Sequence, residues 1–123
     1  MIAHPLILRV AIATPLRRLF DYLPDDASNL NNLQPGLRVS VSFGRRKDVT
    51  GVVVALSNQS DFPYNKLKKI NHVIDRHSVI GSKHLSLLEW ASNYYHYPIG
   101  EVIFSALPSA LRKNNPITKY DEK

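Results

Sequence analysis

The segment Leu37–Phe43, with the sequence LRVSVSF, alternates apolar and polar residues with a strict period of two. This alternation predicts a β-strand with one buried face and one face in water. The apolar run Val49–Leu56, VTGVVVAL, predicts the partner strand, and the basic loop between them, Gly44–Asp48, predicts a hairpin with a longer turn. Gly51 inside the second strand indicates a bulge or a close backbone approach. An antiparallel β-hairpin is therefore the clearest element that the sequence predicts.

The segments around this hairpin predict more short strands. Leu6–Ala13 is rich in branched apolar residues and is ended by Pro15, which has no donor for a β-ladder. Phe20–Tyr22 predicts a short strand with both rings on one side, and Leu67–Asp75 predicts the last strand. Residues 24–36 are rich in turn formers and predict a loop. Short antiparallel strands separated by turns are typical of a small barrel-like sheet.

Helical periodicity follows the strands. A helix is predicted from Ser82, which can cap it, to about Tyr97, and Pro98 ends it. Glu101–Leu107 predicts a short second helix, and residues 109–123 are polar, as in a linker or a tail. The residues that recur at helical spacing and mark the apolar face of the first helix are Leu87, Leu88, Ala91, Tyr94 and Tyr95.

Composition narrows the class of protein. The chain has 123 residues, a formal net charge of +6 and no cysteine, which excludes disulfides and thiolate metal sites. Its longest apolar stretches, such as Leu6–Ala13, are too short to cross a bilayer, and no basic region precedes them as in a signal peptide. We therefore expect a soluble cytoplasmic protein without a membrane partner. The positive charge favours an anionic partner, nucleic acid first.

Basic residues gather beside the predicted strands. The three clusters are Arg17-Arg18, Arg45-Arg46-Lys47, and Lys66 with Lys68-Lys69. Such clusters bind phosphates in nucleic-acid-binding proteins, but they are also typical of solvated turns, and both interpretations stay open. The neighbouring aromatic residues, which can either stack on bases or belong to the core, are Phe20, Tyr22, Phe43 and Tyr64.

Asp21 is unusual among these residues because it is an acid between two aromatic residues. A carboxylate does not attract phosphate, but it can accept a hydrogen bond from a base edge or from a sugar hydroxyl. The alternative is a structural carboxylate that caps a turn or pairs with Arg17 or Arg18. The sequence alone leaves both interpretations open.

Sequence motifs give little support to an enzyme. The chain contains neither a Gly-rich phosphate loop nor a dinucleotide fingerprint, and its five histidines do not have the spacing of a metal-ligand set. No Ser, His and acid stand out as a catalytic set. We therefore expect no metal and no cofactor in this chain, with a self-standing enzyme of unknown type kept as an alternative.

The chain does contain an ordered series of short fragments. They are VA at 10–11, PL at 15–16, FDY at 20–22, PGLRV at 35–39, VSFGR at 41–45, GVV at 51–53, LK at 67–68, Trp90, YY at 94–95, PIGEV at 98–102 and ALP at 106–108. Their order and spacing, over roughly residues 6–112, resemble the N-terminal region of the PriA (primosomal protein N′) family of bacterial replication-restart helicases.

This resemblance implies an α+β fold that is mainly β. A small OB-like antiparallel β-barrel subdomain, about residues 1–76, is followed by a short helical subdomain, about residues 82–112. Together they form a 3′-DNA-end-binding domain over residues 1–112, and residues 113–123 are a truncated linker or tail.

The resemblance also implies a function without catalysis. The domain recognises the 3′-terminal nucleotide of the nascent leading strand at a stalled replication fork and targets the parent helicase for replication restart. In the implied pocket Phe20 packs against the base or sugar, Asp21 bonds the base edge or the 3′-hydroxyl, and Lys68 contacts phosphate. The absence of a Cβ at Gly44 permits close approach of the ligand. The expected DNA-binding residues are Phe20, Asp21, Tyr22, Gly44, Arg45 and Lys68.

The implied partners are DNA with a free 3′ end, forked DNA and the rest of the parent helicase, with other primosome and single-strand-binding proteins as further candidates. ATP, magnesium and zinc are expected only for the full-length parent, an ATP-dependent 3′–5′ DNA helicase. The chain departs from the family pattern at Ser42, where proline is usual, and in a longer loop at 25–33. The alternative function is a protein-interaction module that docks other primosome proteins through an aromatic helix with Trp90, Tyr94, Tyr95 and Tyr97.

Overall fold

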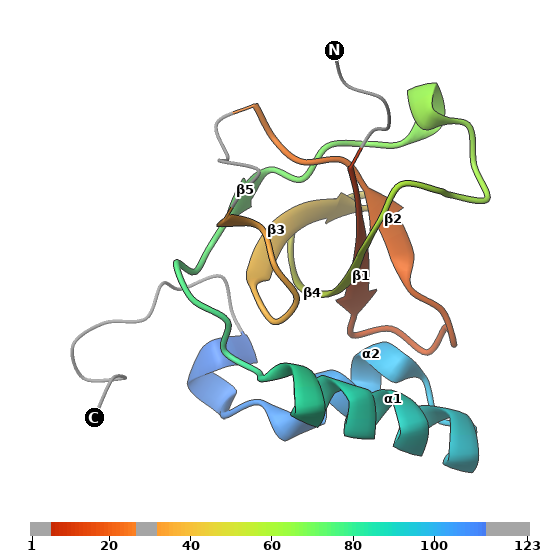
Figure 1. Cartoon of the computed structure of the whole chain (residues 1–123), viewed down its shortest axis with the longest axis vertical. Coiled ribbons are helices and arrows are strands. Elements are labelled where there is room, and N and C mark those ends of the chain that lie inside the picture. Colours follow the sequence, from red (N-terminus) through yellow and green to blue (C-terminus); the bar gives the residue numbers. More distant parts are fainter. Residues whose placement is uncertain (1–5, 27–31, 113–123) are drawn as a thin grey trace.

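The computed structural model describes residues 6–26 and 32–112. The strands are β1 (Ile7–Ile12), β2 (Phe20–Tyr22), β3 (Arg38–Phe43), β4 (Arg46–Ser57) and β5 (His72–Val73). The helices α1 (Ser82–Tyr95) and α2 (Ile99–Ala106) follow the strands and lie together on one side of the sheet (Figure 1). Two single turns of 3-10 helix complete the described part, η2 (Tyr64–Lys66) and η3 (Ser109–Arg112). The predicted α+β, mainly β fold is confirmed.

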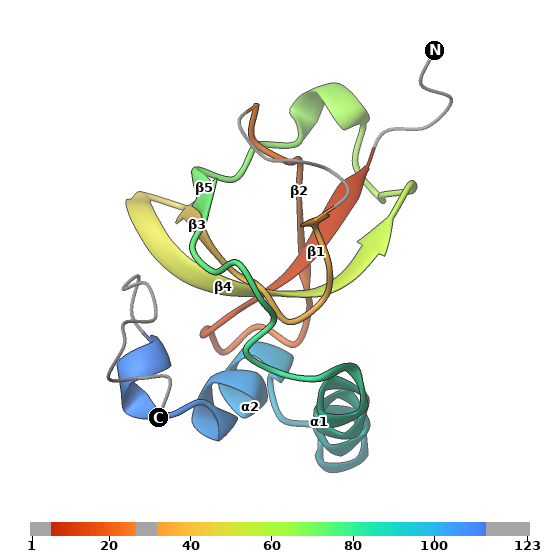
Figure 2. The same cartoon turned by 60° about the vertical axis from the view of Figure 1, so that its left-hand side comes forward.

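The strands form one antiparallel sheet in the order β2-β1-β4-β3-β5. This sheet curves until its two ends approach each other (Figure 2). The backbone N–H of Leu23, directly after β2, donates to the carbonyl of Lys68 at 2.8 Å, and the N–H of Ile70 donates to the carbonyl of Leu23 at 2.8 Å. These two bonds join the β2 edge to the segment before β5. The sheet is therefore a small closed barrel, in agreement with the predicted OB-like architecture.

Apolar residues form two cores on the two faces of this sheet. Inside the barrel, alternate residues of β1, among them Leu8 and Val10, pack with the inward residues of β3 and β4. Ala11 of β1 faces the other way and packs with residues of the helices, among them Leu85 and Ile103. The period of two along β1 therefore builds the barrel interior and the support for the helices from a single strand.

The polar face predicted for residues 37–43 is not in water, and this prediction is wrong. Arg38 is 0% exposed and Ser40 is 1% exposed. The guanidinium of Arg38 donates to both carboxylate oxygens of Asp75, at 2.8 and 2.7 Å, and to the carbonyl of Leu111 at 3.0 Å. Residues after β5 and the turn η3 thus cover the face of β3 that the sequence pattern assigns to solvent. Arg38 can be buried there because its donors have partners.

The β3–β4 hairpin is confirmed, but its turn is shorter than predicted. Strand β4 begins at Arg46, which pairs with Phe43, so that the turn consists of Gly44 and Arg45. Gly44 has a φ of 61°, a left-handed conformation that favours glycine. The close approach predicted at Gly51 is confirmed, since a Cβ there would lie 2.3 Å from a side-chain carbon of Val10.

The apolar face predicted for the first helix is largely wrong. Leu87 and Tyr94 are 59% and 63% exposed, and Tyr95 is exposed as well. The buried residues of α1 are Leu85 and Ser92. The helix therefore touches the rest of the domain along a narrow stripe, and its aromatic residues lie outside that stripe. Gly81 rather than Ser82 is the N-cap residue.

Other boundaries differ in smaller ways. The last strand is much shorter than the predicted 67–75, because residues 67–71 pair only through the contacts with Leu23 and Ser40. The second helix begins at Ile99 rather than at 101, and residues 109–112 form η3. Part of the predicted loop at 24–36 and the predicted tail at 113–123 lie outside the described residues.

Gly100, in the first turn of α2, allows the helix to contact β1. A Cβ at this position would lie 1.7 Å from the carbonyl oxygen of Ile12, which is backbone and cannot rotate away. We expect Gly100→Ala to lower the free energy of unfolding by about 1–3 kcal/mol, measured by urea denaturation. Gly81→Ala is the matched control, because a Cβ there meets no atom within 4 Å. Equal stability of the two variants would contradict this packing.

Candidate nucleic-acid interface

A pocket of about 320 Å³ lies where the barrel is closed. Its walls come from β2, from the turn between β3 and β4, and from the segment 62–68 that leads to β5. Five of the six predicted site residues line it, namely Phe20, Asp21, Tyr22, Gly44 and Lys68. Arg45, the sixth, is exposed in the turn next to Gly44 and is not part of the lining. The fold therefore gathers residues that are up to 48 positions apart in the chain.

Aromatic residues form the inner wall of the pocket. The ring of Phe20 is half-buried and packs edge-to-face on Phe43, with ring centroids 4.8 Å apart. Tyr22 is buried, and its hydroxyl donates to the carbonyl of Ser42 at 2.6 Å. Burial raises the pKa of the Tyr22 phenol to about 12, because the charged form loses its contact with water. Tyr22 therefore stays protonated and holds the turn that carries Gly44.

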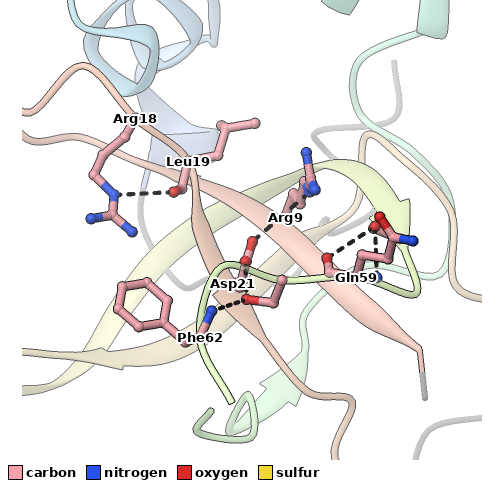
Figure 3. A network of polar contacts seen from close by, with 8 residues as sticks. Arg9, Arg18, Leu19, Asp21, Gln59 and Phe62 are labelled. Atoms are coloured by element: carbon pink, nitrogen blue, oxygen red, sulfur yellow. Dashed lines mark hydrogen bonds and ion pairs between the residues drawn. The ribbon is translucent and has the colours of Figure 1, made fainter. Parts of the chain in front are cut away.

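Asp21 lies on β2 opposite Arg9 of β1, and only 15% of its side chain is exposed. One carboxylate oxygen accepts a hydrogen bond from the hydroxyl of Ser60 at 2.5 Å, and the other lies 4.0 Å from Nε of Arg9 (Figure 3). These partners are different from Arg17 and Arg18, which the structural interpretation of Asp21 had named. The Asp21 carboxylate is thus paired with a hydroxyl group of the protein itself.

Three cations line the same pocket as Asp21, namely Arg18, Lys66 and Lys68. The guanidinium carbon of Arg18 lies 4.9 Å from the ring centroid of Phe20 and 5.6 Å from that of Phe62. Cation–π contacts of this kind hold a guanidinium in place without neutralising it. The lining therefore carries more positive than negative charge, with Asp21 as its one acid.

The three basic clusters contribute unequally to this surface. Arg18 belongs to the first cluster, and Lys66 and Lys68 belong to the third. Arg17 instead makes a 3.0 Å hydrogen bond with the imidazole of His96, and Lys69 pairs with Asp26 at 2.8 Å. Of the second cluster, Arg45 lies in the hairpin turn beside Gly44, and Arg46 and Lys47 are the first residues of β4. Within one cluster, some basic side chains therefore line the pocket, whereas others pair with residues outside it.

Four residues of this site were missed by the sequence analysis as site residues. Arg18 and Lys66 were recognised only as parts of basic clusters, and Phe62 and Ser60 were not considered. The loop that carries Ser60 and Phe62 has no periodicity from which its path could be read. The only local signal is that aromatic and hydroxyl residues lie near Lys66 in the sequence. This proximity does not indicate a contact with β2.

Over residues 6–26 and 32–112, no group of three or more His, Asp or Glu side chains could hold a metal ion. Over the same ranges, neither helix has the length and apolar character needed to cross a membrane.

Comparison with known proteins assigns the chain to a family. Residues 9–108 match the family described as the 3′ DNA-binding domain (3′BD) of PriA. The chain belongs to this family. The matched family is one of DNA-binding domains, so DNA is the partner class of the chain, and the predicted family membership is confirmed.

Individual relatives support the same assignment. The replication restart protein PriA of Haemophilus influenzae is 44% identical over 116 residues, which are 94% of this chain and 15% of that protein. The replication restart protein PriA of Buchnera aphidicola subsp. Schizaphis graminum is 34% identical over 88% of this chain and 14% of that protein. That of Rickettsia conorii is 33% identical over 94% of this chain and 17% of that protein. The chain thus spans about 15% of the length of the relatives it matches.

Proposed function

We propose that the pocket binds the 3′-terminal nucleotide of a DNA strand and so targets a cytoplasmic PriA-type helicase to the nascent leading strand at stalled forks. The charge of the lining carries this proposal, because Asp21 is one carboxylate among several cations. The cations suit backbone phosphates, whereas the carboxylate suits a hydroxyl donor and repels phosphate. A strand that continues past the pocket places a phosphate where a strand end has a hydroxyl. The lining therefore favours an end over an internal nucleotide.

The volume of the pocket supports binding of a single nucleotide. Its volume of about 320 Å³ is at the lower end of the range for small-molecule sites. The ring of Phe20 offers a surface for the base or sugar, and Lys68 lies in reach of the adjoining phosphate. A Cβ at Gly44 would meet no protein atom within 4 Å, so the space that glycine leaves is open to a ligand. Arg45 and Tyr22 act at the margin, Arg45 on phosphates further along the strand and Tyr22 through the turn.

The test compares two single-stranded oligonucleotides that differ only at the 3′ end. We expect the chain to bind the 3′-hydroxyl form at least about tenfold more tightly than the 3′-phosphate form, measured by fluorescence anisotropy at one fixed salt concentration. The preference should persist when salt is raised, while both affinities fall, because phosphate contacts depend on counterion release. Equal affinity for the two ends would contradict end recognition.

A second candidate function is protein docking through the exposed aromatic residues of α1 and the turn after it. The rings of Trp90 and Tyr94 stack with centroids 5.0 Å apart, and those of Tyr95 and Tyr97 stack at 6.2 Å. Exposed aromatic residues of this kind are enriched in protein interfaces. The anisotropy experiment separates the two functions, because protein docking through α1 gives no preference between the two DNA ends.

A further inference from the structure

The hydrogen bond between Ser60 and Asp21 has a fixed direction. An ionised carboxylate only accepts, so the Ser60 hydroxyl donates its proton to the Asp21 oxygen. The oxygen of the same hydroxyl accepts from the backbone N–H of Phe62 at 3.2 Å. A loop residue thus presents to Asp21 the chemical group that a strand end also carries, a hydroxyl attached to a carbon chain.

There is little room at Asp21 for a second hydroxyl. Only 15% of the side chain is exposed, and the oxygen that does not bind Ser60 faces Arg9 of the neighbouring strand. The Nε of Arg9 is buried and has no hydrogen-bond partner. The oxygen bound to Ser60 is therefore the one at which the hydroxyl of a ligand can replace a hydroxyl of the protein.

We propose that the Ser60 hydroxyl is an internal substitute for the hydroxyl of a strand end, and that a 3′-hydroxyl binds Asp21 by displacing it. This inference rests on the proposed function. The exchange replaces one hydroxyl donor by another, so that the carboxylate is paired in both states. A 3′-phosphate or an end without a hydroxyl has no donor for this exchange and leaves the loop in place.

The exchange has a structural consequence for the wall of the pocket. When Ser60 leaves Asp21, the N–H of Phe62 loses the acceptor that fixes its position. Phe62 contributes one of the two rings against which the Arg18 guanidinium lies. Displacement of Ser60 thereby loosens the longer of the two ring contacts of Arg18, while the contact with Phe20 stays in place.

Ser60→Ala removes the internal competitor. We expect this variant to bind 3′-hydroxyl DNA about two- to tenfold more tightly than the wild type, because a typical hydrogen bond no longer has to be broken. Its affinity for the same oligonucleotide with a 2′,3′-dideoxy end should stay at the wild-type value. Anisotropy titrations of both oligonucleotides measure the two affinities, and circular dichroism checks that the variant is folded.

The same loop supplies matched controls. The Ser57 hydroxyl also makes hydrogen bonds to this loop: it donates to the carbonyl of Gln59 and accepts from the N–H of Gln59, both at 3.1 Å. The two partners of the Asp21 carboxylate described above are Ser60 and Arg9, not Ser57. Ser57→Ala should therefore leave both affinities unchanged, and Ser60→Thr, which keeps the hydroxyl, should preserve the wild-type values. A second measurement needs no variant: the amide resonance of Phe62 should shift with 3′-hydroxyl DNA and not with dideoxy DNA.

The outcomes distinguish this inference from the function on which it rests. A Ser60→Ala variant whose affinity for 3′-hydroxyl DNA is unchanged or weaker, beside a wild type that still prefers the hydroxyl end, would overturn the displacement and leave end recognition standing. Equal tightening for both ends would overturn it too, since it indicates general loosening of the loop. A wild type without end preference would overturn both proposals.

Discussion

Asp21→Ala is expected to weaken binding of 3′-hydroxyl DNA by roughly three- to thirtyfold. The reason is that a hydrogen bond to a charged group in this partly buried place contributes about 1.5–3 kcal/mol, and the cost of breaking the Ser60 bond is subtracted from it. Binding of 3′-phosphate DNA should stay the same or improve, because the repulsion between carboxylate and phosphate is removed. The end preference then disappears while weak, salt-sensitive binding to the backbone persists. Anisotropy titrations of both oligonucleotides measure these effects.

Two control variants separate the charge of Asp21 from its position. Asp61→Ala removes an exposed acid from the same loop region without changing the lining, and it should keep the end preference. Asp21→Asn keeps an acceptor oxygen but no charge, so that 3′-phosphate binding improves more than 3′-hydroxyl binding declines. If folded Asp21→Ala retains the full preference, Asp21 has no part in recognition.

Asp75→Ala is expected to lower the free energy of unfolding by about 3–5 kcal/mol. The substitution leaves the Arg38 guanidinium buried without the carboxylate that accepts two of its hydrogen bonds. An unpaired buried charge costs far more than the intact pair contributes. The loss equals a large part of the stability of a typical domain, so the variant should be partly unfolded at 37 °C. Urea denaturation followed by circular dichroism measures the change.

The exposed pair of Asp26 and Lys69 provides the matched control for this variant. Asp26→Ala also removes the carboxylate of an ion pair, but both partners remain in water, and no measurable change of stability is expected. Joint replacement by Arg38→Met and Asp75→Leu should recover most of the stability that Asp75→Ala loses, since no charge is then buried. Similar stabilities of Asp75→Ala and Asp26→Ala would contradict the account of the buried pair.

The hairpin and the positions of the strands along the chain could be predicted because their signals are local. The alternation in Leu37–Phe43 and the apolar run after it are properties of neighbouring residues. The burial of Arg38 could not be predicted, because its partner Asp75 is 37 positions away and the covering carbonyl of Leu111 is 73 positions away. A period of two identifies two faces of a strand, but which other segments cover them is decided by the whole chain.

The residues of the pocket could likewise be predicted only in part. Phe20, Asp21, Gly44 and Lys68 followed from the order of short motifs in the family, and the structure places them together. Ser60 and Phe62 could not be found, because loop residues reach β2 only through the path of the backbone. The aromatic residues of α1 were misplaced for a related reason, since helical spacing shows which residues share a face and not whether that face is covered.

The two backbone bonds at Leu23 are all that joins the β2 edge to the segment carrying Lys68 among the described ladders. The pocket lies at this join, with Asp21 on the β2 side and Lys68 on the opposite side. A nucleotide that touches both residues therefore completes the circumference of the barrel where the polypeptide closes it least firmly. In that state the bound DNA end is part of the closed barrel as well as its ligand. The barrel is then more stable against opening, and this stabilisation increases with the affinity for the end.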